Sequence, residues 1–300
     1  MAKFLGIDVG GGSIKAGVID EEGLLLMEDK IHTDPHWSND EFLKSIIRLT
    51  DSIVNKIQID SIGIGTPGPI DIENGIILRS ANLVNLKNVP LILAIKTEFE
   101  IPVYFNNDAN CAALGEYRFG IGKGCQNLVV FTLGTGLGCG WALNGKIYNG
   151  YRGNGMETGH TTVISNGALC GCGGKGCIEA YFSTTGFLGR YREKTGWSPE
   201  NAKAFFDLCK QNDSNAITVL DQGITLFSEC IRNVVHMINP EKIVLVGGIT
   251  ASHEMFYDKL KDRVNEKIFH VFKDFLKIEI GKNLSGSYGA AALCIQEENL

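Results

Sequence analysis

The sequence has no cluster of lysine and arginine residues and no excess of positive charge. Its 28 basic residues are outnumbered by 34 acidic ones, which gives a formal net charge of -6. Proteins that bind nucleic acids present basic patches to the phosphates, so this balance argues against DNA or RNA as a partner. Any phosphate group that binds here must be held mainly by backbone N–H groups and a metal ion.

The sequence also lacks a signal peptide and a persuasive membrane segment. Only Met1 and Ala2 precede Lys3, where the first apolar run begins. The uncharged run from Gly124 to Gly145 is long enough to raise the question of a membrane span. Its glycines at positions 134, 136, 138 and 140 are more typical of a turn in a soluble protein. We therefore expect a cytoplasmic protein with no membrane partner.

Disulfide bonds are not expected, although the sequence contains nine cysteines. The number is odd, and three of them form a compact group at Cys170, Cys172 and Cys177. The others are scattered through apolar contexts, where a free cysteine behaves as a small hydrophobic residue. A reducing compartment agrees best with this distribution.

The pattern of apolar runs predicts an α/β protein with two similar domains. With 300 residues, 44% of them hydrophobic, the chain can form one large or two medium domains. Two apolar runs flank a glycine-rich turn at Gly10–Ser13, and two more flank Gly134–Gly138, which predicts a β-hairpin at each place. Because a similar plan occurs twice, we expect a cleft between two domains as the place for ligands.

Apolar spacing and turn residues predict the remaining elements. Strands are expected at Leu24–Lys30, Ser61–Gly65, Val103–Phe105 and Ile243–Val246, and helices at Asp40–Ile57 with Asp40 as N-cap, Ala109–Tyr117, Ala216–Ile238 and Tyr288–Glu297.

A group of potential metal ligands is the most specific feature of the sequence. His160 precedes Cys170, Cys172 and Cys177, and the cysteines are separated by glycines in a short loop. One imidazole and three thiolates can form a closed tetrahedral zinc site, which would be structural. The alternative is a set of core thiols without a metal. Glu157 and Glu179 flank the group, either as rigidly placed hydrogen-bond acceptors for a hydroxyl-rich ligand or as surface and metal-supporting carboxylates.

The two glycine-rich turns are candidates for phosphate binding. Glycine permits consecutive N–H groups to point toward one anion, so the turns could hold opposite ends of a triphosphate. Asp8, at the end of the first strand, could hold Mg²⁺ through water, and Lys15 follows the turn. Plain hairpin turns are the alternative, since a single glycine motif is a weak signal.

Asn107 and Asp108 stand where a strand is expected to give way to a helix. Either residue suits the N-cap of that helix, which is the structural explanation. A carboxylate at a helix N-terminus stays ionised and can also accept a proton from a substrate hydroxyl. We therefore keep both roles open for Asp108.

Taken together, these motifs resemble the ROK family of bacterial sugar kinases, within the actin/Hsp70/hexokinase-like (ribonuclease H-like) superfamily. The resemblance extends over nearly the whole chain. It depends on the motifs at Asp8–Lys15, Asn107–Asp108, Leu133–Gly138, Glu157–His160 and Cys170–Glu179.

The resemblance implies an α/β protein with an interdomain cleft between two domains. It assigns residues 1–118 and 288–300 to a small N-terminal domain and residues 119–287 to a larger one. It also implies an ATP-dependent hexose kinase that requires Mg²⁺ with ATP and contains structural Zn²⁺. The partner would be a small hexose, with glucose first, and the protein would form a dimer or tetramer.

The resemblance also implies a role for each candidate residue. Asp108 would be the general base for the sugar hydroxyl, and His160 would bind zinc through one ring nitrogen and the sugar through the other. The remaining hydroxyls would contact Gly68, Asn82, Asn107, Glu157 and Glu179. ATP would contact Asp8, Gly10, Gly11, Gly12, Ser13, Lys15, Gly134, Thr135, Gly136, Gly138, Gly247 and Gly248.

Some positions depart from the family pattern. Gly12 stands where relatives often have a threonine. Met156 precedes Glu157 at a position where relatives usually have a glycine, and Cys139 stands where a glycine is common. These differences leave polyphosphate as an alternative phosphate donor.

Other acceptors also stay open: N-acetylmannosamine, N-acetylglucosamine, allose and fructose. Alternatives of another class are a sugar-responsive repressor, a non-catalytic sugar sensor and an actin-like ATPase. Repressors of the family carry a winged helix ahead of the first motif, and with seven residues before Asp8 we expect none here.

Overall fold

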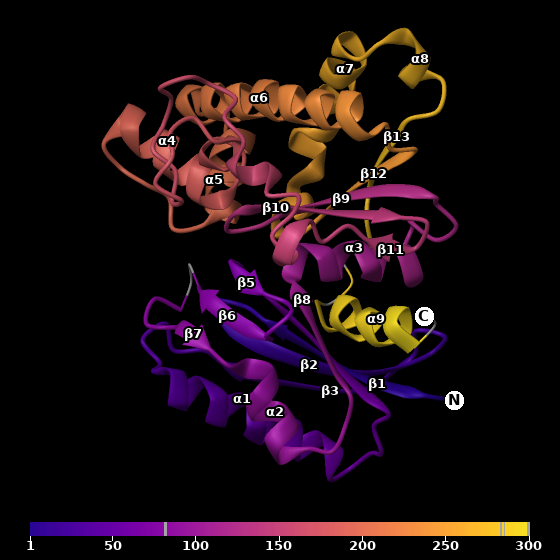
Figure 1. Ribbon diagram of the computed structural model, residues 1–300. Helices are drawn as coiled ribbons and strands as arrows, with labels where there is room; N and C mark the ends of the chain where they lie inside the picture. Colours follow the sequence, from indigo (N-terminus) through magenta and orange to yellow (C-terminus); the bar gives the residue numbers. More distant parts are fainter. Residues whose placement is uncertain (81–82, 283, 285, 299–300) are drawn as a thin grey trace. The chain divides into compact units, whose positions relative to one another are not determined.

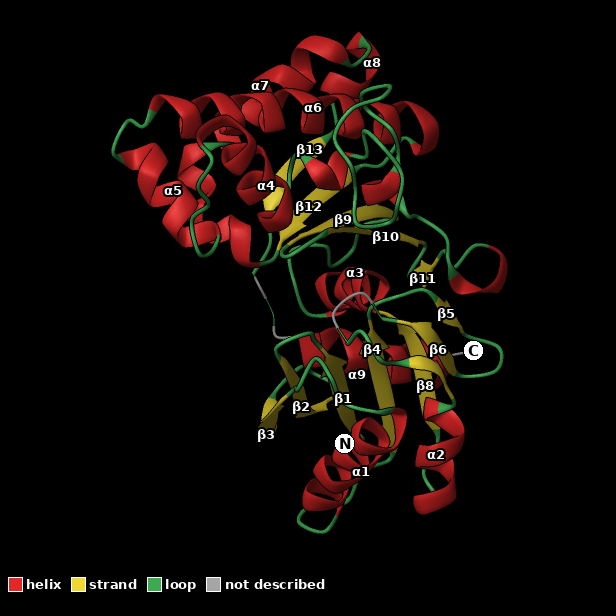
Figure 2. Ribbon diagram, turned by 90° about the vertical axis from the view of Figure 1, so that its left-hand side faces the viewer, coloured by secondary structure: helices red, strands yellow, loops and turns green. Residues whose placement is uncertain are grey.

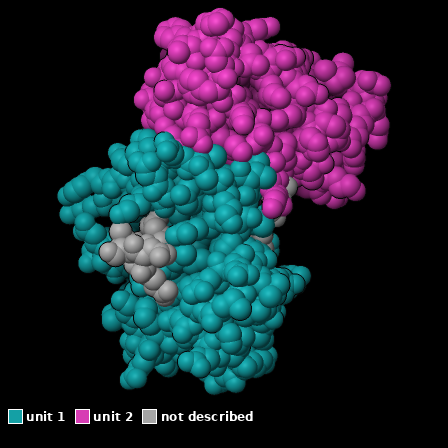
Figure 3. All heavy atoms as spheres, turned by 90° about the vertical axis from the view of Figure 1, so that its right-hand side faces the viewer, with its two compact units in different colours: residues 1–126, 140–156, 284–300 teal, residues 127–139, 157–283 magenta. Residues whose placement is uncertain are grey.

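The structure is a computed structural model in which residues 1–80, 83–282, 284 and 286–298 are described. It divides into two compact units (Figure 3). Unit 1 contains residues 1–126, 140–156 and 284–300, and unit 2 contains residues 127–139 and 157–283. The α/β architecture agrees with the expected fold class. The expected domain boundaries stay a prediction, because compact units need not coincide with independently folding domains.

Unit 1 is built on a five-stranded mixed sheet with the order β3-β2-β1-β4-β8 (Figure 1). The expected hairpin is confirmed, since β1 pairs antiparallel with β2 and β2 with β3. β1, β4 and β8 are parallel, so their carboxyl ends lie at one edge of the sheet. The strands are β1 (Lys3–Val9), β2 (Ser13–Asp20), β3 (Leu25–His32), β4 (Ser61–Thr66) and β8 (Val103–Asn107).

Helices cover this sheet, and a small sheet with the order β5-β6-β7 accompanies it. The further elements of unit 1 are α1 (Asn39–Val54), α2 (Leu91–Glu98), α3 (Asp108–Arg118), α9 (Gly286–Glu298), β5 (Ile70–Asp71), β6 (Ile76–Arg79), β7 (Lys87–Val89), β11 (Lys146–Ile147) and η1 (Tyr151–Gly153).

The expected N-cap of α1 is wrong. Ser38, not Asp40, accepts the hydrogen bond from the N–H of Glu41, and the Glu41 carboxylate accepts the N–H of Ser38 in return. This reciprocal capping box satisfies two backbone donors, whereas Asp40 lies inside the first turn.

Close packing of α9 against the sheet depends on two glycines. A Cβ on Gly6 would lie 1.8 Å from the carbonyl oxygen of Ser287, and a Cβ on Gly63 would lie 1.9 Å from that of Ala290. Neither position can therefore carry a side chain while the helix keeps its place. α9 also contacts α3, so it connects the sheet to the helix that begins at Asp108.

Unit 2 contains most of a second five-stranded sheet, with the order β11-β10-β9-β12-β13. The division between the units falls within β10. β9, β12 and β13 are parallel, so here too their carboxyl ends share one edge. The strands are β9 (Asn127–Leu133), β10 (Leu137–Leu143), β12 (Lys242–Val246) and β13 (Lys277–Ile280).

The helices of unit 2, drawn in red in Figure 2, are joined by a cluster of buried phenylalanines. Phe182 stacks on Phe227 with ring centroids 4.5 Å apart, and Phe187 stacks on Phe205 at 4.9 Å. No helix in the described part of the chain is both long and apolar enough for a membrane span. The helices are η2 (Thr158–His160), η3 (Ile178–Ala180), α4 (Thr184–Thr195), α5 (Ala202–Lys210), α6 (Ser214–Ile238), η4 (Gly248–Met255), α7 (Tyr257–Lys267) and α8 (His270–Lys273).

The substitution Gly63→Ala should destabilise unit 1. Its methyl group would overlap the backbone of α9, so we expect the free energy of unfolding to fall by about 1–3 kcal/mol. Urea unfolding followed by circular dichroism measures the change. Gly189→Ala is the matched control, because nothing lies within 4 Å of a Cβ at this position in α4. It should be neutral or stabilising by up to about 1 kcal/mol. Equal stabilities of the two variants would contradict the packing argument.

Candidate functional site

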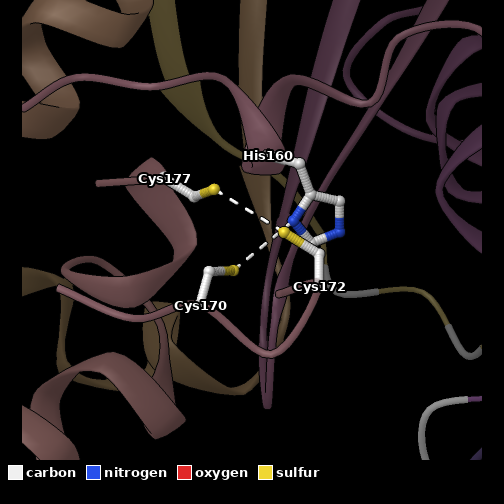
Figure 4. Close-up of side chains that lie close together, drawn as sticks. All are labelled: His160, Cys170, Cys172 and Cys177. Carbon is white, nitrogen blue, oxygen red and sulfur yellow. Dashed lines mark hydrogen bonds between the residues drawn. The ribbon is translucent and has the colours of Figure 1, made fainter. Parts of the chain in front are cut away.

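The four expected metal ligands form one cluster in unit 2 (Figure 4). The donor atoms of His160, Cys170, Cys172 and Cys177 all lie within 4.8 Å of one another. Nδ1 of His160 lies 3.6 Å from Sγ of Cys170, and the Sγ atoms of Cys172 and Cys177 are 3.7 Å apart. A tetrahedral zinc ion, with bonds of about 2.1 Å to nitrogen and 2.3 Å to sulfur, places its donors about 3.6–3.8 Å apart. The donor set and these separations therefore fit zinc.

Tight turns of the backbone bring the four donors together. Gly173 and Gly176 have φ angles of +88° and +77°, a conformation that glycine adopts without strain. Gly176 also packs against Ile164, and a Cβ there would lie 1.7 Å from the Ile164 carbonyl oxygen. Gly173 and Gly176 are thus required by the shape of the loop.

The thiols of the cluster differ in how readily they lose their protons. The N–H of Gly174 donates to Sγ of Cys172 at 3.4 Å, and this hydrogen bond lowers the pKa of the Cys172 thiol. Burial raises the pKa of Cys170 to about 12, so at neutral pH this thiol stays protonated unless a cation lies beside it. A metal ion supplies that positive charge and releases the protons.

Two glutamates lie beside the two nitrogens of the His160 ring. Oε1 of Glu179 is 3.8 Å from Nδ1, which faces the cluster, and Oε2 of Glu157 is 4.0 Å from Nε2. Glu157 is 51% exposed, whereas Glu179 is 19% exposed. Burial raises the pKa of the Glu157 carboxyl, and a positive charge on His160 opposes this effect. His160 can therefore bind a metal through Nδ1 while Nε2 faces Glu157, outside the cluster.

The glycine-rich turns of unit 2 lie at the carboxyl edge of its sheet. Thr132 and Val246 are partners in the parallel β9–β12 pair, so the turn after each strand leaves from the same edge. A Cβ on Gly247 would lie 2.5 Å from the carbonyl oxygen of Leu133, which shows how closely the two turns approach. Thr135, Gly136 and Gly138 belong to the first turn and its exit into β10, and Gly248 to the second.

In unit 1, two carboxylates lie on either side of Gly65. Asp8 is the parallel β1 partner of Gly65, and a Cβ on Gly65 would lie 3.8 Å from Cα of Asp108. Both aspartates also act on the thiol of Cys111: burial raises its pKa well above the usual value, and the charges of Asp108 and Asp8 raise it further. The candidate general base and the candidate magnesium ligand thus share one edge of the sheet.

The first glycine-rich turn adjoins Asp8. The turn is closed by a hydrogen bond from the N–H of Gly10 to the carbonyl oxygen of Ser13. The hydroxyl of Thr33 donates to the carbonyl oxygen of Gly11. Gly12 is exposed with open space around it, and Lys15 lies opposite Asp8 in the β1–β2 pair. Burial raises the pKa of Asp8, and the charge of Lys15 opposes this shift.

Asn107 caps α3, since its side chain accepts the N–H of Ala109. Asp108, the first residue of the helix, is half-buried and its carboxylate accepts the same N–H. Gly68 follows β4 and is joined to Pro69 by a cis peptide bond. Asn82 lies outside the described residues. The candidate residues that the structure describes therefore form two groups, one in each unit.

The sequence analysis missed a buried amide network behind Asp108. The Asn106 side chain donates to Oδ1 of Asn149 at 2.9 Å and accepts the N–H of Asn107, while Asn110 donates to Oδ1 of Asn106. The network anchors the corner between β8 and α3. Its signal in the sequence is the run of four polar residues in 106–110 directly after an apolar strand.

Comparison with known proteins now defines the family. The model of the ROK family matches residues 4–297, so the chain belongs to the ROK family. The glucokinase of Thermotoga maritima is 33% identical over 283 residues, covering 90% of this chain and 89% of that protein.

Solved structures agree with this assignment. The ROK hexokinase from Thermus thermophilus superposes with a TM-score of 0.88 at 26% identity, covering 99% of this chain and 100% of the other. The ROK family glucokinase from Streptomyces griseus, in complex with glucose and AMPPNP, has a TM-score of 0.83 at 28% identity over 97% of this chain and 99% of the other. The actin/hexokinase-like fold expected from the sequence is confirmed.

Purified protein should contain about one zinc ion per chain, and Cys172→Ser should lose most of it. A serine hydroxyl stays protonated and is a poor zinc ligand, so the site would keep three good donors. Elemental analysis by mass spectrometry measures the ratio. Cys209→Ala, at a buried cysteine of α5 outside the cluster, is the control and should keep its zinc. Active protein without metal would contradict the assignment.

Proposed function

We propose that this protein is a cytoplasmic, ATP-dependent hexose kinase that phosphorylates glucose at the 6-hydroxyl. One observation carries the proposal: Asp8 and Asp108 flank Gly65 at the edge of the unit 1 sheet, beside the first glycine-rich turn. Phosphoryl transfer needs a positioned hydroxyl, a positioned phosphate and compensation of negative charge. This edge offers a group suited to each requirement.

Asp108 would act as the general base toward the attacked hydroxyl. A carboxylate is far less basic than an alkoxide, so it would orient the hydroxyl and take its proton late in the transfer. The amide network around Asn106 and the cap at Asn107 would hold the carboxylate in place. Asp8 would hold Mg²⁺ through water, and the N–H groups of the first turn would contact the phosphates.

The residues of unit 2 would bind the rest of both substrates. Glu157, His160 and Glu179 would accept or donate hydrogen bonds to the sugar hydroxyls, with Gly68, Asn82 and Asn107 contributing from unit 1. The Gly134–Gly138 turn would contact phosphates, and Gly247–Gly248 would lie near the adenosine. Three thiolates and one imidazole close the coordination of a zinc ion, so zinc would be structural and would fix the sugar-binding loop.

The relatives support glucose and ATP more than other substrates. Four curated glucokinases are 27–33% identical over at least 90% of this chain. The S. griseus structure contains glucose together with AMPPNP, an analogue of ATP. N-acetylmannosamine, N-acetylglucosamine, allose and fructose are alternative acceptors, and a coupled ADP assay over a panel of these sugars distinguishes them.

A sugar-responsive regulator is the second candidate. The xylose repressor of Bacillus spizizenii is 28% identical over 97% of this chain and 77% of that protein. Release of ADP that depends on a hexose supports the kinase, whereas sequence-specific retardation of DNA without ADP release supports the regulator.

Asp108→Asn should lower kcat by about 10²–10⁴-fold, because the amide cannot take the proton. Sugar binding, measured by calorimetry, should change by less than about threefold, since the amide remains a hydrogen-bonding group. Asp40→Asn, at an exposed carboxylate of α1, is the control and should keep full turnover. Turnover of Asp108→Asn close to that of the unaltered protein would rule out the base.

Glu157→Gln should raise the KM for the sugar by about tenfold and leave the KM for ATP nearly unchanged. The ionised carboxylate forms stronger hydrogen bonds with hydroxyl donors than the neutral amide does. Steady-state kinetics with each substrate varied in turn measures both constants. An equal rise in both KM values would contradict a specific contact with the sugar.

A further inference from the structure

Glu179 contacts the second glycine-rich turn as well as the metal cluster. Its Oε2 accepts the N–H of Leu137 at 3.0 Å, and a Cβ on Gly136 would lie 2.4 Å from the same oxygen. Its other oxygen, Oε1, is 3.6 Å from Sγ of Cys170 and 3.8 Å from Nδ1 of His160. One carboxylate therefore bridges the metal ligands and the turn.

Further contacts connect the same segments. The Cα of Gly159, next to His160, packs so closely that a Cβ would lie 2.0 Å from the carbonyl oxygen of Leu137. Past Glu179 in the chain, the N–H of Thr184 donates to the carbonyl oxygen of Gly134 at 2.9 Å. The N–H and the hydroxyl of Thr185 both donate to the carbonyl oxygen of Thr135. The segments on either side of the cysteines thus hold the turn at several of its residues.

Ser183 makes this connection rigid. Its side chain is fully buried, and its hydroxyl donates to the carbonyl oxygen of Glu179 at 2.7 Å while accepting the N–H of Gly186. The backbone that carries Glu179 is therefore fixed to the start of α4. A carboxylate on a rigid backbone can fix the orientation of the peptide group with which it bonds.

We propose that Glu179 is a positioning residue for the nucleotide: its carboxylate orients the Gly134–Gly138 turn, so the metal cluster supports binding of the ATP phosphates. The inference rests on the proposed function and gives Glu179 a second role, in addition to its contact with the sugar. Gly134 and Gly136 have no side chain to hold their peptide groups in one orientation. The bond from Leu137 to Glu179 fixes the exit of the turn, where the next N–H groups must face a phosphate.

The test measures binding of Mg²⁺·AMPPNP by calorimetry in the absence of sugar. Glu179→Ala removes the acceptor of the Leu137 N–H and should weaken nucleotide binding by about tenfold, which is the expected effect of losing one such hydrogen bond. Glu179→Gln keeps an oxygen at the same place and should stay within about threefold of the unaltered protein.

Glu179→Asp separates positioning from a role of charge at the metal. Aspartate keeps the negative charge but is one methylene shorter, so it cannot reach Leu137 and should bind nucleotide as weakly as Glu179→Ala. If the charge beside the metal ligands mattered instead, the aspartate variant would retain affinity and the glutamine variant would lose it. That order of affinities would overturn the proposal.

Zinc content and a matched variant complete the experiment. Glu193→Ala removes a carboxylate of α4 that is 62% exposed, and it should leave nucleotide affinity unchanged. Zinc is measured in each sample, and loss of zinc from Glu179→Gln or Glu179→Ala would assign Glu179 to the metal and overturn the proposal. Unchanged affinity in Glu179→Ala would also overturn it. Failure of the unaltered protein to bind AMPPNP would contradict the proposed function itself.

Discussion

Parallel strand pairing is the constraint on which both groups of candidate residues depend. β1, β4 and β8 run in one direction in unit 1, and β9, β12 and β13 do so in unit 2. The residues at the carboxyl ends of parallel strands lie at the same edge of the sheet, even when they are far apart in the sequence. Asp8 and Asp108 reach the same edge in this way, on either side of Gly65, although 100 residues separate them in the sequence, and the turns at Gly134 and Gly247 approach each other likewise. The chemistry of the site therefore follows from the topology of the sheets.

The cluster of candidate metal ligands lies in a loop with little apolar surface, which a bound metal would order. The segment from His160 to Cys177 contains five glycines and few large hydrophobic residues, so burial alone gives it little stability. In the zinc-bound form that we propose, ligation by four side chains would add to the small buried cluster around Cys170 and Cys177. The hydrogen bonds of Glu179 and Ser183 then extend this order to β10 and α4.

Local patterns in the sequence predicted the hairpins, the long helix α6 and the grouping of the four candidate metal ligands, because each depends on neighbouring residues or on a short spacing. The N-cap of α1 was wrong, since Ser38 and Asp40 are both good caps and the reciprocal bond with Glu41 decided between them. The partners of Asn149 and Glu179 could not be predicted. Their contacts at Asn106 and Leu137 join residues 43 and 42 positions apart, and only tertiary packing brings these together.

The placement of α9 affects the order in which unit 1 can fold. This helix, formed by residues 286–298, packs on strands made from residues 3–9 and 61–66. Residues 286–298 must therefore leave the ribosome before the sheet of unit 1 is covered on that face. Until then Gly6 and Gly63 border an open apolar surface, which chaperones or other nascent chains can reach.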